Sequence, residues 1–217
     1  ALTATTIGSS GGVTITGTTP TLTIGDAGAE DTKIVFDGNA QDFHIGLDDT
    51  DDDLKIGLGS ALGTTPHMVF TESGEITKPL QPAFGVHPAS NQTDIALNSS
   101  VTVVWGTELF DVGANFASNT FTAPVTGKYS LNFSLYFQDF DTAATYYQAS
   151  LVTSNRTFYD TVTPGTWSAT EEFYHLMISM VADMDASDTV SVKIYQSGGT
   201  QQTDIMSTSS FSGALLC

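Results

Sequence analysis

The stretch FTAPVTGKYSLNFSLYF, residues 121–137, has the most regular hydrophobic pattern of the chain. From residue 129 onward, alternate residues are apolar or aromatic, and the residues between them are polar but uncharged. The apolar set is Tyr129, Leu131, Phe133, Leu135 and Phe137, and the polar set is Ser130, Asn132, Ser134, Tyr136 and Gln138. A period of two predicts a β-strand with one face in a core. The opposite face is one that a subunit contact would tolerate.

The sequence on both sides of this strand is also typical of β structure. Pro124 and Gly127 predict a tight turn just before the strand. Further apolar and aromatic segments of strand length cover residues 101–105, 120–123, 146–152, 173–180, 190–195 and 211–216. So many strands within about 135 residues predict a β-sandwich or jelly roll.

Three motifs in this half point to a known family. They are FDVGANF at 110–116, FTAPVTGKYSLNF at 121–133 and FSGALL at 211–216. Together they resemble the globular C1q domain, a jelly roll that shares its architecture with the tumour necrosis factors, over residues about 83–217. The resemblance implies a C1q/TNF-like jelly-roll head. Because such domains form compact homotrimers, it also implies a homotrimer.

The first eighty residues follow a different pattern of short apolar triplets. Their centres recur about every ten residues, and the triplets lie at 13–15, 22–24, 34–36, 43–45, 54–56 and 68–70. Each triplet predicts a short strand with one buried face. Strands this short bury too little apolar surface to offset the conformational entropy of ordering the segment. We therefore expect identical copies to share one core around an axis.

These two patterns predict an all-β protein of two parts. Residues 1–80 are expected to form an elongated trimeric β-shaft, and residues 81–217 the jelly-roll head. The segment KPLQP at 78–82 is expected to be a stiff linker, because its two prolines fix φ. The shaft resembles the low-complexity β segments that precede head domains in the fibres of tailed bacteriophages.

Charge excludes two classes of partner. The chain has 24 Asp and Glu against 6 Lys and Arg, for a net charge of −18. Without a basic stripe to neutralise phosphates, binding to nucleic acid is not expected. An anionic membrane surface would also repel the chain, and no apolar run is long enough for membrane insertion. The single cysteine, Cys217, allows no intrachain disulfide, so the fold can form in a reducing cytoplasm.

Three aromatic residues are candidates for receptor contacts. Trp167 lies in the loop-like stretch TPGTWS, and Tyr146 and Tyr147 follow the small-residue stretch DTAAT. Exposed aromatic rings beside polar groups stack on sugars or anchor protein contacts. Alternation along a strand requires that one of the two adjacent tyrosines faces inward.

One acidic run is a candidate metal site. In DDTDDD, residues 48–53, the alternate carboxylates of Asp49, Asp51 and Asp53 could converge on Ca²⁺, which prefers oxygen ligands. The alternative is a solvated turn rich in aspartate, and the chain lacks the glycine and glutamate of an EF-hand at the required positions. Some C1q-like domains bind calcium, and no other cofactor is expected.

An enzyme is not expected. The chain contains none of the common hydrolase, zinc, redox or nucleotide-binding motifs. A glycosidase would need two suitably spaced carboxyl groups, and the adjacent acids are Asp139 with Asp141 and Glu171 with Glu172. Such pairs are more often solubilising turns.

The expected function is therefore structural and adhesive. The chain is predicted to be the trimeric fibre or spike of a bacteriophage, at the virion surface and outside the cell. Its head would bind a glycan or protein of the host surface, and its N-terminal end would join other virion or fibre proteins. The alternatives are a secreted bacterial adhesin or filament subunit and, less favoured, a polysaccharide depolymerase.

Overall fold

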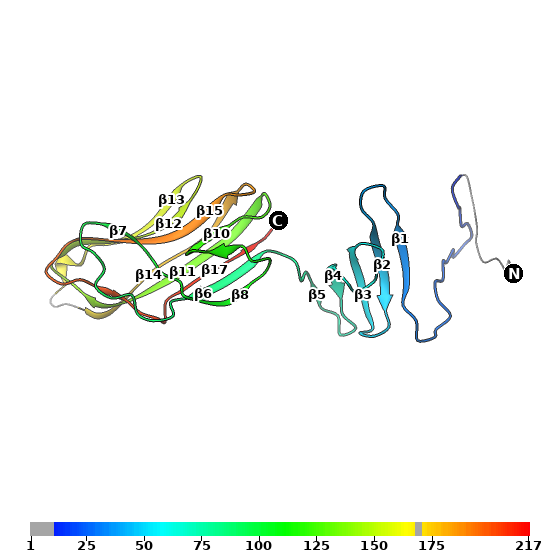
Figure 1. Cartoon of the computed structure of the whole chain (residues 1–217), viewed down its shortest axis with the longest axis horizontal. Helices are drawn as coiled ribbons and strands as arrows, with labels where there is room; N and C mark the ends of the chain where they lie inside the picture. The colour runs from blue at the N-terminus through cyan, green and yellow to red at the C-terminus, as the bar shows by residue number, and fades with distance from the viewer. Residues whose placement is uncertain (1–10, 168–170) are drawn as a thin grey trace. The chain divides into compact units, whose positions relative to one another are not determined.

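The computed structural model describes residues 11–167 and 171–217. In these ranges every regular element is a β-strand except η1, a 3₁₀ turn at Pro164–Thr166. The prediction of an all-β protein is therefore confirmed. The chain divides into two compact units, Ala1–Pro79 and Leu80–Cys217, coloured blue to cyan and green to red in Figure 1. No helix among the described residues is long and apolar enough to cross a membrane.

The C-terminal unit is a sandwich of two sheets. The first sheet has the order β14 (Glu171–Met184), β11 (Gly127–Phe140), β17 (Ser210–Leu215), β6 (Ala83–His87) and β8 (Thr107–Asp111), and β16 (Asp204–Ile205) pairs with β11. The second has the order β13 (Thr157–Val162), β12 (Ala144–Thr153), β15 (Thr189–Gly198), β10 (Thr120–Thr122) and β9 (Phe116–Ala117), and β7 (Ser100–Thr102) pairs with β15. All these pairings are antiparallel. Most neighbours in the two sheets come from distant parts of the chain, as in a jelly roll.

The strand β11 organises this sandwich. Its predicted inward residues are all buried, and its polar residues are half-buried on the other face. It pairs with β14 over almost its whole length and with β17 on its other side. Between the sheets, Phe84 lies 4.6 Å from Phe121 and 4.8 Å from Phe211, measured between ring centroids. The alternation prediction for 129–137 is confirmed.

One predicted strand is shorter than expected. The apolar run 101–105 is β structure only to Thr102, although Val103 still donates a hydrogen bond to Val192. The next two amides bond to side chains instead: that of Val104 to Gln92 Oε1 at 2.9 Å and that of Trp105 to Asn119 Oδ1 at 2.8 Å. Side-chain acceptors from distant loops thus replace the sheet partner, which an apolar pattern does not reveal.

The N-terminal unit is a single antiparallel sheet. Its strands follow the chain in order: β1 (Thr32–Phe36), β2 (Phe43–Asp48), β3 (Asp53–Leu58), β4 (Pro66–Phe70) and β5 (Ile76–Thr77). The last four of the predicted triplets lie in these strands. The triplets 13–15 and 22–24 form no strand, and the single chain offers them no sheet partner.

One side of this sheet is covered, and it is the polar side. His44 is buried, with Nδ1 2.9 Å from the carbonyl oxygen of Gly59. Buried Lys55 donates to Asp48 Oδ2 at 2.7 Å and to Asp51 Oδ2 at 2.5 Å. These bonds raise the pKa of Lys55, and the bond from Lys55 lowers the pKa of Asp48 despite its burial. A carboxylate pair thus compensates the buried charge.

The other side of the sheet is apolar and open. Across the strands, Ile34 is paired with Ile45, Ile45 with Ile56, and Ile56 with Met68. We call the set the apolar sheet face: Ile34, Phe36, Phe43, Ile45, Leu47, Leu54, Ile56, Leu58, Met68, Phe70 and Ile76. Phe36, Phe43 and Leu47 are 60%, 42% and 43% exposed. One chain therefore does not bury this face by itself, and its burial by identical copies stays a prediction. The buried residues of the triplets are all middle residues: His44, Lys55 and Val69.

Candidate functional site

Tyr147, predicted to contact a receptor, lies in the core. Its side chain is fully buried, and its ring stacks on Phe140 with 3.8 Å between centroids. The hydroxyl oxygen accepts a hydrogen bond of 2.8 Å from the Asp141 amide, and burial raises the pKa of the phenol. The prediction for Tyr147 is wrong, because alternation along β12 turns this tyrosine inward and its neighbour outward.

Trp167 follows the turn η1 and is half-buried. Its ring lies 5.0 Å from that of Tyr174 and 5.7 Å from that of Phe140, so one side of the indole packs on the core. Trp167 thus belongs to the same aromatic cluster as Tyr147, at the end of the sandwich. Its role in receptor binding stays a prediction.

Asp141, one of the adjacent acids considered for catalysis, is engaged in holding a loop. Its buried carboxylate accepts hydrogen bonds from the amides of Ala143 at 2.8 Å, Thr200 at 2.5 Å and Gln201 at 2.9 Å. Burial raises its pKa, but the hydrogen bonds outweigh burial and the net effect is a lowered pKa. The carboxylate is therefore a structural acceptor between two loops rather than an exposed acid.

Replacing Asp141 by asparagine is expected to destabilise the C-terminal unit by about 1–3 kcal/mol at pH 7, because an amide cannot accept from all these donors. The folded-state pKa lies below the unfolded one. The stabilisation from Asp141 is thus present above the unfolded-state pKa, about 3.9, and is lost as pH falls through the folded-state pKa. Urea melts from pH 7 to pH 3 should show a weaker acid dependence in Asp141→Asn than in the wild type. Asp139→Asn is the control, at a neighbouring acid with φ of 57°. It should change little in the free energy of unfolding or in its dependence on pH.

Tyr146 lies on the outer face of the second sheet. It is half-buried and its ring stacks on that of Tyr195, with 5.8 Å between centroids and 21° between planes. A hollow of about 360 Å³ extends from this pair across β12 and β13. It is lined by Ser100, Tyr146, Gln148, Ser150, Val152, Thr157, Tyr159, Lys193 and Tyr195. We call this set the tyrosine face.

Tyr159 and Tyr195 were not among the residues expected from the sequence. Tyr159 lies on β13, the next strand along the chain, and Tyr195 lies on β15, far from Tyr146 in the chain. Only the register, in which Ser150 is paired with Tyr159 and Gln148 with Tyr195, brings them to one face. In the sequence, Tyr159 and Tyr195 each occupy one position of an alternating strand, but this pattern does not tell which strands become neighbours in the sheet.

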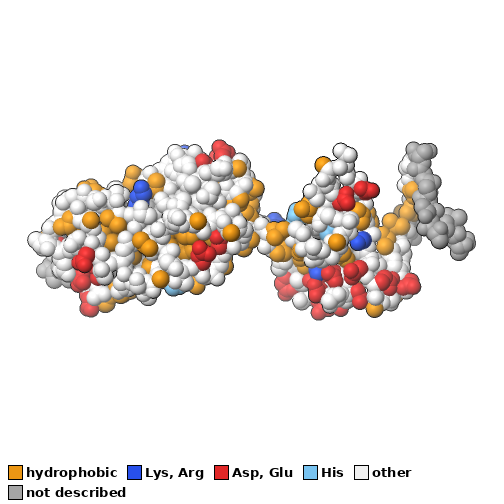
Figure 2. Space-filling view, viewed as in Figure 1, with side chains coloured by type: hydrophobic (Ala, Val, Ile, Leu, Met, Phe, Trp, Pro, Cys, Tyr) orange, Lys and Arg blue, Asp and Glu red, His pale blue; other side chains and the backbone are white. Residues whose placement is uncertain are grey.

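The three aspartates proposed for calcium do not gather within one chain. Asp51 binds Lys55, and Asp53 Oδ1 accepts the Glu72 amide at 3.2 Å. Asp49 contributes its own amide to Asp31 Oδ1. In the described part of the chain, no group of three or more His, Cys, Asp or Glu is arranged to hold a metal ion. The intrachain calcium site is therefore not formed, and the carboxylates line a solvated edge that Figure 2 shows in red below the N-terminal unit.

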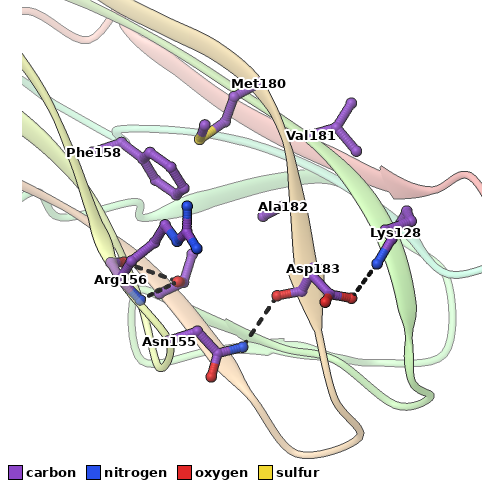
Figure 3. Close-up of a pocket in the computed structure, with 9 residues that line it drawn as sticks. Lys128, Asn155, Arg156, Phe158, Met180, Val181, Ala182 and Asp183 are labelled. Atoms are coloured by element: carbon purple, nitrogen blue, oxygen red, sulfur yellow. Dashed lines mark hydrogen bonds and ion pairs between the residues drawn. The ribbon is translucent and has the colours of Figure 1, made fainter.

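A second groove, of about 590 Å³, lies beside the edge strands β13 and β14. Figure 3 shows Lys128 donating to Asp183, at 2.6 Å, and Arg156 on the opposite side near Phe158. The guanidinium carbon is 5.8 Å from the Phe158 ring centroid, and among the described residues it makes no ion pair. Asn155 donates to the Asp183 carbonyl and to Asp188. Because Asp183 pairs with Lys128, the groove offers an anion only the charge of Arg156.

The middle of the outer face of β11 and β14 is free of charge, with the Lys128–Asp183 ion pair at one end of it. We call it the uncharged sheet face: Ser130, Asn132, Ser134, Tyr136 and Gln138 on β11, and Phe173, His175, Met177, Ser179 and Val181 on β14. Phe173, Met177 and Val181 are substantially exposed, and Met177 is 60% exposed. The rings of Tyr136 and His175 stack at 4.2 Å. In a chain with 24 acidic residues, an exposed stretch of sheet as long as this set with no acid is unusual for a surface bathed in water.

Comparisons with known proteins give similarity in structure only. No family model matches the chain, and no curated protein matches it. The globular domain of zebrafish complement 1qA protein is 14% identical to this chain, with a TM-score of 0.46. The match spans 63% of this chain and 98% of that domain. Murine APRIL, in a crystal structure, is 13% identical, with a TM-score of 0.47. That match spans 63% of this chain and 99% of the APRIL chain. The C-terminal unit is an all-β sandwich with the sheet order of a jelly roll.

Proposed function

We propose that this chain is the fibre or spike of a bacteriophage virion, a non-enzymatic homotrimer whose jelly-roll head attaches to the host surface. In this proposal the N-terminal unit is the shaft, and its N-terminal end joins other virion or fibre proteins. The assembly lies at the virion surface, outside the cell, after folding in the host cytoplasm without disulfides.

The observation that carries the proposal is the apolar sheet face. A single sheet with one apolar side exposed to water loses the main source of folding free energy. Covering the remaining exposed area would contribute on the order of 1 kcal/mol for each large side chain. Three sheets around one axis can each turn such a face inward and enclose a common core. Ile24, which lines a hollow of about 210 Å³ with Ile34 and Ile45, shows that the preceding segment also reaches this face.

The uncharged sheet face supports the same assembly in the head. Apolar side chains such as Met177 and Val181 stand beside small polar ones such as Ser134, so a neighbouring copy would bury no unpaired charge. The net charge of −18 on each chain opposes association through long-range repulsion. Contact surfaces without carboxylates keep that repulsion away from the interface.

The non-enzymatic part of the proposal is supported by the use of the candidate acids. The carboxylate of Asp141 is occupied by backbone amides, so it is not free to act with Asp139 as a glycosidase pair. A glycosidase needs one acid with a raised pKa, and the pKa of Asp141 is lowered. These contacts argue against Asp139 and Asp141 as a pair that cleaves a surface polymer.

Sedimentation equilibrium or light scattering of the full chain at micromolar concentration tests the trimer. The expected mass is about 69 kDa, three times the 22.9 kDa of one chain. A mass of one or two chains would overturn the proposal. Immunogold electron microscopy with antibodies against the chain then locates it: labelling of phage particles is expected, and labelling of bacterial surfaces alone would favour an adhesin.

A further inference from the structure

We propose that the tyrosine face is a binding site for a neutral oligosaccharide. The inference rests on the proposed function, because it assigns the ligand class and the residues by which the head attaches to a surface. It also corrects the initial set of receptor residues: Tyr146 is retained, Tyr147 is excluded, and Tyr159 and Tyr195 are added.

The rings form two platforms. Tyr146 and Tyr195 stack on each other at one end of the face, and Tyr159, 60% exposed, lies on β13 at the other end. Tyr195 and Tyr159 are two strands apart and two residues apart along the strands, which separates their Cα atoms by roughly 12 Å. Aromatic faces pack against the C–H faces of sugars. A separation of this size suits an extended ligand of more than one ring, rather than a single sugar.

The polar groups between the platforms suit hydroxyl groups. Gln148 and Ser150 lie between the platforms, and Thr157 lies just beyond Tyr159. All three are uncharged, and Ser150 Oγ, which donates to the Lys193 carbonyl at 3.3 Å, can still accept a hydrogen bond. Gln148 is held in place by a bond from Nε2 to Thr161 Oγ1 at 3.1 Å, which leaves its Oε1 available as an acceptor. A neutral sugar presents hydroxyls that both donate and accept, so this mixed set can satisfy them without burying a charge.

Charge argues for a neutral ligand rather than an acidic one. No carboxylate lines the face, although the chain has 24 acidic residues, and Lys193 is its one charged lining residue. The neighbouring Asp160 turns toward the first sheet, where its carboxylate accepts the Met177 amide at 3.1 Å. A polyanion would meet one cation locally and the field of a chain with net charge −18 at longer range. A neutral glycan avoids this repulsion.

The face stays accessible in the proposed trimer. It lies on the second sheet, whereas the uncharged sheet face lies on the first, and the buried core separates the two. A neighbouring copy that covers β11 and β14 therefore leaves β12, β13 and β15 facing solvent. The three copies would present three such faces, and surface glycans would then bind with avidity.

The test uses the full-length trimer, a microarray of neutral and acidic oligosaccharides, and host or candidate host cells. Binding to neutral oligosaccharides is expected, and Tyr159→Ala and Tyr195→Ala should each weaken it about tenfold or more, by loss of a stacking platform. Tyr159→Phe keeps the ring and should retain most of the affinity. Thermal melting and trimer mass of each variant establish that it is folded.

Three results would overturn the inference. One is neutral-glycan binding that is unchanged in the folded alanine variants, and another is binding confined to acidic oligosaccharides. The third is attachment to cells without binding to any neutral oligosaccharide. Each of these leaves the proposed attachment function standing, because the head still binds a surface. A folded trimer that binds neither cells nor oligosaccharides would overturn both proposals.

Discussion

Replacing Ile45 by glutamate is expected to raise amide hydrogen exchange in β1 to β4 about a hundredfold or more, while exchange in the C-terminal unit stays unchanged. Ile45 is at the centre of the apolar sheet face, with Ile34 and Ile56 as its cross-strand neighbours. In a shared core, three glutamates would meet in a dry environment with no basic partner nearby. Leaving a buried charge unpaired costs about 3–5 kcal/mol, and about 2.8 kcal/mol already corresponds to a hundredfold change in an opening equilibrium.

Val35→Glu is the matched control for this experiment. Val35 is β-branched like Ile45 and belongs to the neighbouring strand, but its Cα partner is His44, on the opposite side of the sheet. It is already partly exposed, so a charge there is solvated and exchange should change less than about fivefold at a surface site. Mass spectrometry of peptides from residues 32–70, at micromolar chain concentration, measures both variants. Similar exchange in Ile45→Glu and wild type would show that the apolar sheet face is open to water in solution.

The regular parts of the fold were predictable because local pattern and tertiary role agree. In β11 the period of two, the preceding turn and the position between two long partners all favour the same strand. The β-sandwich follows from the number of such segments, and the alternation at Tyr146 and Tyr147 correctly required one inward ring. The sequence did not show which of the two tyrosines faces inward. In the structure it is Tyr147, whose hydroxyl accepts a hydrogen bond from the Asp141 amide.

The parts that could not be predicted depend on which strands become neighbours. Tyr159 and Tyr195 join Tyr146 only through the register of β12 with β13 and β15. The aspartates of the acidic run looked equivalent in sequence, but the position of Lys55 gives Asp48 and Asp51 an ion-pair role. In the N-terminal unit, the period of two identified the two faces but not which of them a single chain covers. The loop 59–65 covers the polar one, where Gly57 leaves room for the Thr65 carbonyl oxygen.

Replacing Phe211 by alanine is expected to destabilise the C-terminal unit by about 3–5 kcal/mol, the usual cost of such a cavity. Phe211 is fully buried, with ring centroids 4.8 Å from Phe84, 5.7 Å from Trp105 and 6.2 Å from Phe116. Domains of this size are stable by about 5–15 kcal/mol, so the loss is a large share of the total. The melting temperature should fall by about 10–17 °C. Scanning calorimetry of the full chain measures it.

Val125→Ala is the control, since Val125 is 46% exposed and its truncation should shift the melting temperature by less than about 2 °C. A fall of under about 3 °C in Phe211→Ala would mean that the two sheets do not pack as the sandwich described. Phe211 lies in the interior of the head, so its loss should lower the melting temperature without changing the mass at low temperature. Ile45→Glu should instead open the N-terminal unit and leave melting of the head in place. If Phe211→Ala affects only the melting of the head and Ile45→Glu affects only the N-terminal unit, then the head has a core within each chain and the N-terminal unit has a core shared between chains.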